Sequence, residues 1–189
     1  MSTVHDLEKL APLAADAPLK FPAAPYESAS AYFGGYAEEL TRAASSVDTA
    51  AFARAAEILL DAYTREATVF SCGNGGSASI ANDHAYQDVF THQLRSQARP
   101  GDVLVAVSSS GRSANIVTAL RWARDHGLGT ISLTGFDGGE ARTLADVCVH
   151  VDGTNYGVIE DLHQTIMHAL AQYIRQSRMT PAAISSSVF

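Results

Sequence analysis

The chain has 189 residues and a mass of 20.0 kDa, with 47% hydrophobic and 17% charged residues. This balance suits one globular domain and excludes a wholly disordered chain. No apolar run reaches the roughly 18–20 residues that a membrane span needs, and the opening MSTVHDLEKL lacks the apolar core of a secretory signal. The net charge of −7 argues against a broad nucleic-acid surface. We therefore expect a cytoplasmic protein with no membrane or nucleic-acid partner, in which Cys72 and Cys148 are buried, reduced thiols.

The N-terminal third of the chain predicts an arm followed by a pair of helices. Residues 1–27 are rich in proline and alanine, so we expect a loose N-terminal arm. A helical period follows over residues 28–45, carried by Tyr32, Phe33, Tyr36 and Leu40. Asp48 suits the N-cap of a second helix that runs to Tyr63. The aromatic face of the first helix is too apolar for a solvated surface and predicts a contact with another copy of the chain.

The remainder of the chain alternates strand-like and helix-like segments. Four continuous apolar runs (67–72, 103–107, 129–134, 147–151) alternate with helical patterns at 115–126, 140–145 and 158–178, before a tail at 179–189. Continuously apolar strands between helices predict an α/β fold: a doubly wound parallel sheet with helices on both faces. Such sheets bind ligands at the carboxyl ends of their strands.

The first predicted strand ends in a glycine-rich segment, Gly73-Asn-Gly-Gly-Ser-Ala78. Glycines let backbone N–H groups approach an anion, and a following helix adds its dipole. The segment lacks the glycine spacing of a dinucleotide fingerprint and the lysine of a Walker A loop. A phosphate-binding loop and a tight turn that needs positive φ both fit this sequence.

The second strand ends in Ser108-Ser-Ser-Gly-Arg-Ser113, directly before a helix. Its hydroxyls, together with the free N–H groups of the helix, suit a phosphate monoester held without a metal. A serine-rich helix cap is the alternative. Two such loops at one edge of the sheet favour the phosphate interpretation more than either loop alone.

The last helix carries Glu160, Gln164 and His168 at a spacing that places them along one face. A carboxylate and a histidine there could bind a divalent metal or move protons, whereas a purely polar helix face is the alternative. His163 lies some 140° from His168, so we expect it to point away from this site. Asp83 and His84, in the polar segment after the glycine-rich loop, could reach substrate hydroxyls or lie in a plain loop.

Together these motifs resemble the sugar isomerase (SIS) family, and within it the enzymes that isomerise sedoheptulose 7-phosphate. The residues that carry the resemblance follow the family order over about 28–178: Cys72–Ala78, Ala81–Asp83 with Tyr86, Ala98–Asp102, Ser108–Ser113, Leu133–Gly135 with Asp137–Gly139, and Glu160–His168. The resemblance implies a cytoplasmic homotetramer with an N-terminal helical pair. It also implies a zinc site, with His168 as catalytic acid/base or zinc ligand and Glu160 as a co-ligand, although Glu160 stands where the family has Gln.

The resemblance also implies a substrate site. It assigns the phosphate to serine hydroxyls and the sugar to the neighbouring loops; the phosphate residues are Ser77, Ser108, Ser110 and Ser113 with Ser109 beside them, and the sugar residues are Asn74, Gly75, Gly76, Asn82 and Asp83.

The chain departs from the family pattern after Ser77. The family continues with a His and, four residues on, a Glu that bind zinc, the Glu also being the proposed base. Here Ala81-Asn-Asp83 follows almost at once. The downstream register favours the absence of about 30–40 residues, one strand–helix–strand step, near residues 78–82. A true deletion is one explanation and a segment omitted from this sequence is the one we favour; in an ungapped reading, His84 and Asp88 mimic the missing pair.

We interpret the chain as a phosphosugar aldose–ketose isomerase. The resemblance implies conversion of sedoheptulose 7-phosphate to D-glycero-D-manno-heptose 7-phosphate, or a relative at C2 or the anomeric carbon, for nucleotide-heptose synthesis. The alternative is a non-catalytic SIS module that binds a sugar phosphate or a protein, as the replication-initiator-associating members do. Loss of a catalytic carboxylate would favour this alternative.

Overall fold

A pair of helices precedes the sheet in the computed structural model, which describes residues 21–74 and 86–188. Helix α1 (Ala29–Ser45) starts at Ser28, whose side chain accepts a hydrogen bond from the backbone N–H of Ala31. Helix α2 (Thr49–Thr64) starts at Asp48, whose carboxylate accepts from the N–H of Ala50 at 2.8 Å. Each cap satisfies a backbone donor that the first helical turn leaves free. The predicted helical pair and its cap at Asp48 are confirmed.

Four parallel strands form one sheet in the order β1-β2-β3-β4. They are β1 (Val69–Gly73), β2 (Val103–Ser108), β3 (Gly129–Thr134) and β4 (Val147–His150). Each strand pairs in parallel with the next along the chain, so all four carboxyl ends lie along one edge. The four predicted strands and their parallel arrangement are confirmed.

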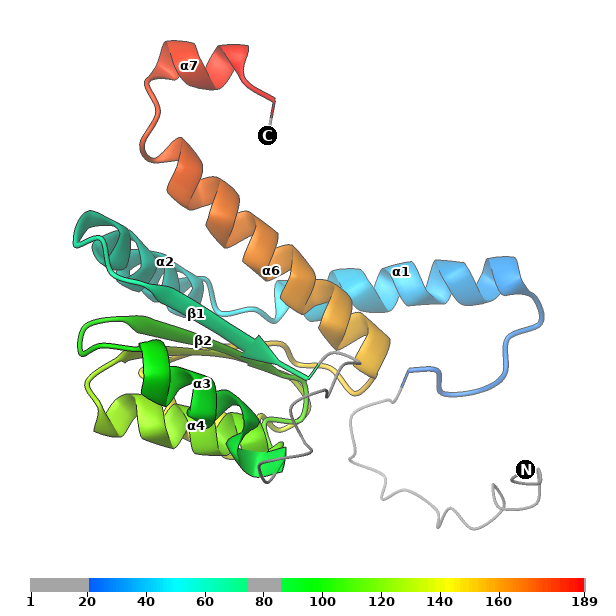
Figure 1. Ribbon diagram of the computed structural model, residues 1–189. Helices are drawn as coiled ribbons and strands as arrows, with labels where there is room; N and C mark the ends of the chain where they lie inside the picture. Colours follow the sequence, from blue (N-terminus) through cyan, green and yellow to red (C-terminus); the bar gives the residue numbers. More distant parts are fainter. Residues whose placement is uncertain (1–20, 75–85, 189) are drawn as a thin grey trace.

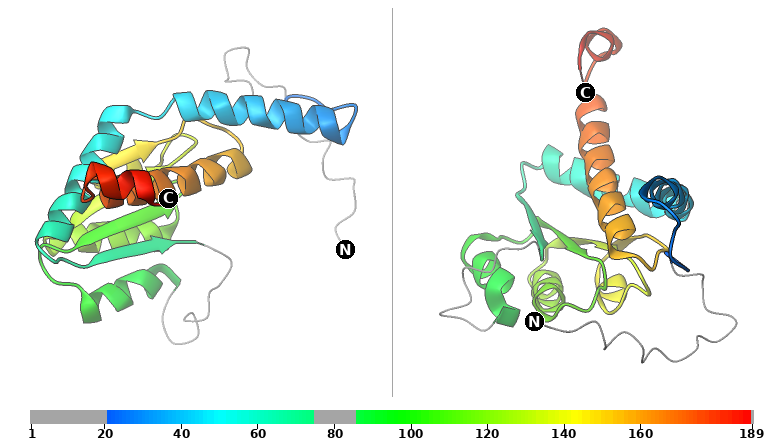
Figure 2. Two further views of the ribbon diagram at one scale, coloured as in Figure 1. Left: turned by 90° about the horizontal axis from the view of Figure 1, so that it is seen from above. Right: turned by 90° about the vertical axis from the view of Figure 1, so that its right-hand side faces the viewer.

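Helices cover both faces of this sheet (Figures 1 and 2). Side chains of α1, α2 and α6 (Tyr156–Gln176) pack with β2, β3 and β4 into one apolar core. On the opposite face, α3 (Val89–Gln97), α4 (Ala114–Asp125) and α5 (Ala141–Leu144) pack against β1 and β2 in a second core. Coverage of both faces buries most residues of β2 and β3, whereas β1, at the end of the strand order, is mostly exposed.

Two short elements and one helix were not expected from the sequence. A 3₁₀ turn, η2 (Tyr86–Asp88), leads into α3, and α7 (Pro181–Ser186) lies within the segment 179–189 that we expected to be a tail. The buried side chains of α3 are Val89, Thr91 and Leu94. Because a threonine takes the middle of this buried face, the apolar periodicity of α3 is incomplete in the sequence.

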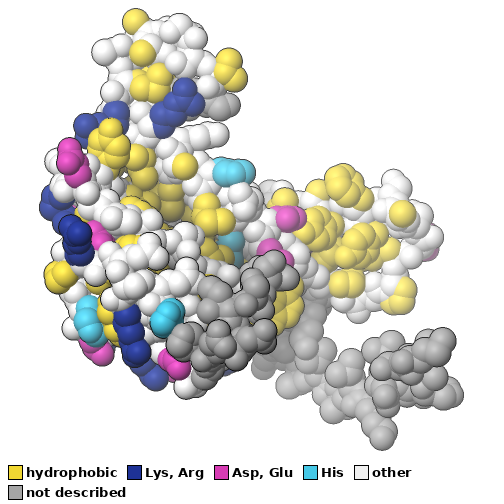
Figure 3. All heavy atoms as spheres, in the orientation of Figure 1, with side chains coloured by type: hydrophobic (Ala, Val, Ile, Leu, Met, Phe, Trp, Pro, Cys, Tyr) yellow, Lys and Arg dark blue, Asp and Glu magenta, His cyan; other side chains and the backbone are white. Residues whose placement is uncertain are grey.

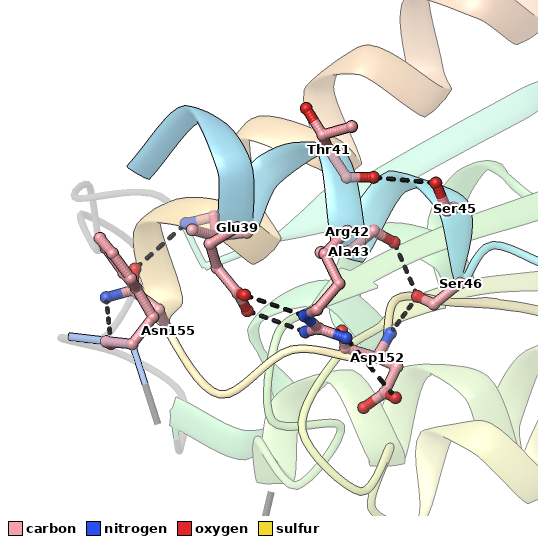
Figure 4. A network of polar contacts seen from close by, with 10 residues as sticks. Glu39, Thr41, Arg42, Ala43, Ser45, Ser46, Asp152 and Asn155 are labelled. Atoms are coloured by element: carbon pink, nitrogen blue, oxygen red, sulfur yellow. Dashed lines mark hydrogen bonds and ion pairs between the residues drawn. The ribbon is translucent and has the colours of Figure 1, made fainter. Parts of the chain in front are cut away.

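A polar network joins the end of α1 to the loop that precedes α6 (Figure 4). Nε and Nη2 of Arg42 each donate a hydrogen bond of 2.8 Å to the carboxylate of Glu39. Nη2 also donates to the backbone carbonyl of Asp152 at 2.9 Å. The backbone N–H of Asp152 donates to Ser46 at 2.8 Å. Asn155 then caps α6 by accepting from the N–H of the third residue of the helix at 3.2 Å. These contacts fix where α6 begins, and therefore which of its residues reach the sheet edge.

Candidate active site

A cavity of about 470 Å³ opens at the carboxyl edge of the sheet, where the sequence predicts ligand binding. Its walls come from the end of β1 (Ser71–Asn74), from the loop after β2 (Val107–Ser110 with Ser113), and from one face of α6. The residues that α6 contributes are Tyr156, Glu160, His163, Gln164 and Met167. The structure thus brings together the serine loop, the start of the glycine-rich loop and the polar helix.

The serine loop, residues 108–113, is shaped by its own hydroxyls. The backbone N–H of Gly111 donates to the Ser108 hydroxyl at 3.2 Å, and the N–H of Arg112 donates to the Ser110 hydroxyl at 3.3 Å. Each of these oxygens still has its own proton to donate to a ligand. Ser113 is the N-cap residue of α4, yet its side chain makes no capping hydrogen bond. Ser113 also lines the cavity, and its hydroxyl has no capping role in the helix.

A second loop, residues 135–139, packs against the serine loop and is bonded to it. The N–H of Gly135 donates to the carbonyl of Ser109 at 2.8 Å, and Arg112 forms an ion pair with Asp137. Gly111 has φ of +63°, and a Cβ there would collide with the backbone of Gly138. A glycine is required at position 111 both for its backbone conformation and for this close approach.

The end of β1 forms the opposite wall. Cys72 is buried there, and burial raises the pKa of its thiol to about 12, so it is a neutral wall residue and not a nucleophile. Both cysteines are free thiols, but Cys148 is half-buried, so the expectation that both are buried holds only for Cys72. Asn74 lines the cavity and pairs with Asn115 of α4. The other residues predicted for this wall, Gly75, Gly76, Ser77, Asn82 and Asp83, lie outside the described residues.

Helix α6 presents a different face to the cavity from the one we expected. The lining residues sit at i, i+4, i+7, i+8 and i+11 from Tyr156, which is the regular stripe of an α-helix. His163 follows Glu160 by three residues and belongs to this stripe, so the expectation that it points away from the site is wrong. His168 lies eight residues beyond Glu160, about 80° round the helix. It is exposed, is not among the residues that line the cavity, and its Nε2 lies 2.8 Å from Nε2 of Gln164.

Two adjacent carboxylates on α6 point to different partners. Glu160 lines the cavity, whereas Asp161 accepts a hydrogen bond of 2.6 Å from the hydroxyl of Tyr36 on α1. Burial and this hydrogen bond raise the pKa of Tyr36 to about 12, so the phenol stays protonated and donates. Asp161 therefore joins the two helices, and Glu160 is the carboxylate that lines the same cavity as the serine loop.

His163 is 2% exposed, and neither ring nitrogen has a hydrogen-bond partner within the described residues. Burial lowers its pKa, and nearby His150 acts in the same direction, while the backbone of Thr134 opposes the shift. The imidazole is therefore neutral at pH 7, and its ring contributes to the inner wall of the cavity.

The described residues do not by themselves assemble a zinc site. No three side chains of His, Cys, Asp or Glu come together anywhere in residues 21–74 and 86–188. Glu160 faces the cavity, but the Nε2 of His168 is engaged with Gln164. A metal at this edge would need ligands from beyond these residues.

The four-stranded parallel sheet thus has a cavity at its carboxyl edge that is lined by several serines and by one carboxylate, that of Glu160. The SIS domain family model matches residues 80–135. The chain is 31% identical over 185 residues to phosphoheptose isomerase from Cytophaga hutchinsonii, covering 80% of this chain and 94% of that protein. It is also 31% identical over 160 residues to phosphoheptose isomerase from Escherichia fergusonii, covering 67% and 83%. The chain belongs to the phosphoheptose isomerase family of SIS-domain proteins.

Solved structures support the same assignment. Phosphoheptose isomerase from Neisseria gonorrhoeae is 28% identical and superposes with a TM-score of 0.70 over 77% of this chain and 96% of that one. The enzyme from Francisella tularensis, at 24% identity and a TM-score of 0.71 over 78% and 96%, shares the fold. The predicted family and fold class are confirmed.

The alignment with the Cytophaga hutchinsonii relative is longer than the part of this chain that it covers. The match to the Cytophaga hutchinsonii protein extends over 185 residues but uses 80% of 189 residues, about 151, of this chain. Part of that relative therefore has no counterpart within the matched part of this chain.

Proposed function

We propose that this chain interconverts a seven-carbon ketose phosphate and the corresponding aldose phosphate, with sedoheptulose 7-phosphate as substrate. Membership of the phosphoheptose isomerase family supports the reaction. The observation that carries the proposal is the position of Glu160, a carboxylate on the cavity wall formed by α6, where the serine loop forms another wall. Two relatives at 31% identity are named phosphoheptose isomerase, so we do not favour the non-catalytic regulator.

The phosphate would bind to the serine loop. Hydroxyls of Ser109 and Ser113, the remaining protons of Ser108 and Ser110, and the start of α4 supply hydrogen-bond donors and a favourable dipole. This arrangement holds the dianion at one end of the cavity and leaves the sugar chain to extend along α6.

The chemistry requires transfer of a proton between C1 and C2. In the proposal, the Glu160 carboxylate takes a proton from C1, and the released electron pair forms the C1=C2 double bond while the C2 oxygen gains a proton. The enediol then receives a proton at C2, and the O1 proton leaves as the C1 carbonyl forms. Gln164 lines the cavity one turn further along α6 and could hydrogen-bond the oxygen on which charge develops. His168, bonded to Gln164, remains a predicted acid/base group.

The test is isomerisation of sedoheptulose 7-phosphate by the unaltered protein, by Glu160→Gln and by Asp161→Asn. Glu160→Gln should lower kcat by about 10²- to 10⁴-fold, the usual range for a general acid/base group. Asp161→Asn is the matched control, because it keeps an acceptor for Tyr36 on a neighbouring residue that serves α1. If Glu160→Gln retains more than about a tenth of kcat, or if both variants lose activity equally, Glu160 is not the base.

We include self-association in the proposal. Tyr32 and Phe33 on α1 are 40% and 71% exposed, and apolar side chains gather along this helix, which projects from the sheet (Figures 1 and 3). An exposed aromatic surface of this kind suits burial against another copy, and the family resemblance implies a homotetramer. Light scattering at micromolar concentration should give the mass of four chains, and the mass of one chain would contradict this part of the proposal.

A bound zinc ion and a segment missing near residues 78–82 remain predictions, and each can be tested by one measurement. The length of the match to the Cytophaga hutchinsonii protein supports a segment missing from this chain, and the sequence motifs favour a position near residues 78–82. An intact mass near 20.0 kDa would indicate a true deletion, and a mass several kDa higher would indicate an omitted segment. Metal analysis of the same sample tests for zinc. We also propose a cytoplasmic location. In the described part of the chain, no helix is long and apolar enough to cross a membrane.

A further inference from the structure

The side chains of Asn74 and Asn115 form a reciprocal amide pair between β1 and α4. Nδ2 of Asn115 donates to Oδ1 of Asn74 at 2.6 Å, and Nδ2 of Asn74 donates to Oδ1 of Asn115 at 3.2 Å. Asn115 is completely buried, whereas Asn74 is exposed and lines the cavity. The amide pair links the end of β1 to the first turn of α4, and its two residues lie 41 positions apart in the sequence.

The orientation of the pair is set from the α4 side. The backbone N–H of Ile116 donates to Oδ1 of Asn115 at 2.9 Å, so the oxygen of that amide must face the start of the helix. The nitrogen of Asn115 then faces Asn74 as a donor, and Asn74 must present its own oxygen to it. One backbone N–H therefore determines which way the Asn74 amide points.

Asn74 is the member of the pair that lines the cavity, and it keeps hydrogen-bonding capacity there. Both acceptor positions of Asn115 Oδ1 are used, by Ile116 and by Asn74. Asn74 uses one of its two N–H groups and one of its two lone pairs on the pair. It keeps one donor and one acceptor at the cavity wall, which is the combination that binds a sugar hydroxyl, itself both donor and acceptor.

We propose that Asn115 is a positioning residue that orients Asn74 to bind a hydroxyl of the sugar chain, separately from the phosphate on the serine loop. The proposal rests on the sugar-phosphate function proposed above and on the assignment of Asn74 to the sugar that the family resemblance implies. It adds Asn115 as the residue that orients the Asn74 amide. The approach of β1 to β2 supports it: Gly73 pairs with Val107, and a Cβ at Gly73 would lie 3.3 Å from the Val107 carbonyl oxygen. A glycine at this position brings the strand end close enough for Asn74 to meet α4.

A double-mutant cycle on the full chain tests the pair, with binding of sedoheptulose 7-phosphate and of inorganic phosphate measured by calorimetry. Asn74→Ala and Asn115→Ala should each weaken sugar-phosphate binding by about tenfold, the value of one hydrogen bond, and the double variant should lose about the same tenfold. Affinity for inorganic phosphate should stay within about twofold, because the serine loop is unchanged. Losses that multiply in the double variant, equal losses for inorganic phosphate, or no loss at all would overturn the proposal.

Two further measurements keep the result interpretable. Asn115→Ser is tested beside Asn115→Ala, because serine keeps a hydroxyl for the Ile116 backbone but is too short to reach Asn74; it should reproduce the tenfold loss. Because Asn74 is exposed, Asn74→Ala should not disturb folding. This variant alone therefore shows whether the affinity for the sugar phosphate falls while the affinity for inorganic phosphate stays unchanged. If the unaltered protein binds sedoheptulose 7-phosphate without isomerising it, the proposed function fails, while the binding cycle still decides the role of Asn115.

Discussion

Replacing Ser113 by alanine tests whether this serine binds the ligand or caps helix α4. An N-cap serine changed to alanine normally costs about 0.5–2 kcal/mol of stability, because a backbone donor of the first turn loses its acceptor. The Ser113 side chain makes no capping hydrogen bond in α4, so no such bond is lost. We therefore expect Ser113→Ala to change the free energy of unfolding by less than about 0.5 kcal/mol.

The same change should weaken the binding of a sugar phosphate. A hydrogen bond from a hydroxyl to a charged phosphate oxygen contributes about 1–3 kcal/mol, which corresponds to about 5- to 150-fold in Kd. The measurements are calorimetric titration with sedoheptulose 7-phosphate and urea unfolding of the same preparations. Ser113→Ala should thus raise Kd with an almost unchanged midpoint of unfolding.

Asp48→Ala is a control with the opposite expected result, namely a loss of stability without a loss of ligand affinity. Asp48 caps α2 through a hydrogen bond of 2.8 Å to the backbone N–H of Ala50, and it is not among the residues that line the cavity. This variant should lose about 0.5–2 kcal/mol of stability and keep its affinity for the ligand. A Ser113→Ala protein that is as destabilised as Asp48→Ala, with unchanged ligand affinity, would refute the assignment of Ser113 to the phosphate.

Two further changes test the interior of the site. Burial lowers the pKa of His163 from 6.5, so as the pH falls below 6.5 the unfolded chain binds a proton before the folded one. Stability then decreases as the pH falls, by up to about 1.4 kcal/mol per pH unit. His163→Leu should therefore flatten the dependence of urea-unfolding stability on pH between pH 7 and 5, and an identical slope in the variant and the unaltered protein would contradict this. Gly111→Ala should cost more stability than Gly127→Ala, because both glycines have positive φ but a Cβ at Gly111 collides with the backbone of Gly138. Equal melting temperatures of the two glycine variants would show that the serine loop tolerates the displacement.

Local residue patterns were sufficient to predict the architecture of the sheet. Continuous apolar runs at the four strands require cover on both faces, and the structure has helices on both. Parallel strands align their carboxyl ends, so Ser108–Ser110 and Asn74 were expected at one edge and are found around one cavity. The helix α3 was not predicted, because Thr91 interrupts its buried face.

The direction in which each side chain of α6 points was decided by tertiary contacts alone. Sequence spacing gives the angles between residues of a helix, but not which angle faces the sheet. That angle is set by partners far away in the chain: Arg42 holds the loop before α6 at Asp152, and Tyr36 binds Asp161. These contacts turn Glu160 toward the cavity.

Tertiary contacts likewise decided the positions of the two histidines and of the amide pair. Rotation of α6 about its axis places His163 at the cavity wall and leaves His168 outside it. The partnership of Asn74 with Asn115 spans 41 residues, and it arises because Gly73 allows β1 to lie against β2 at that point. Spacing along the chain carries no information about such a contact, since it depends on how two strands and a helix pack together.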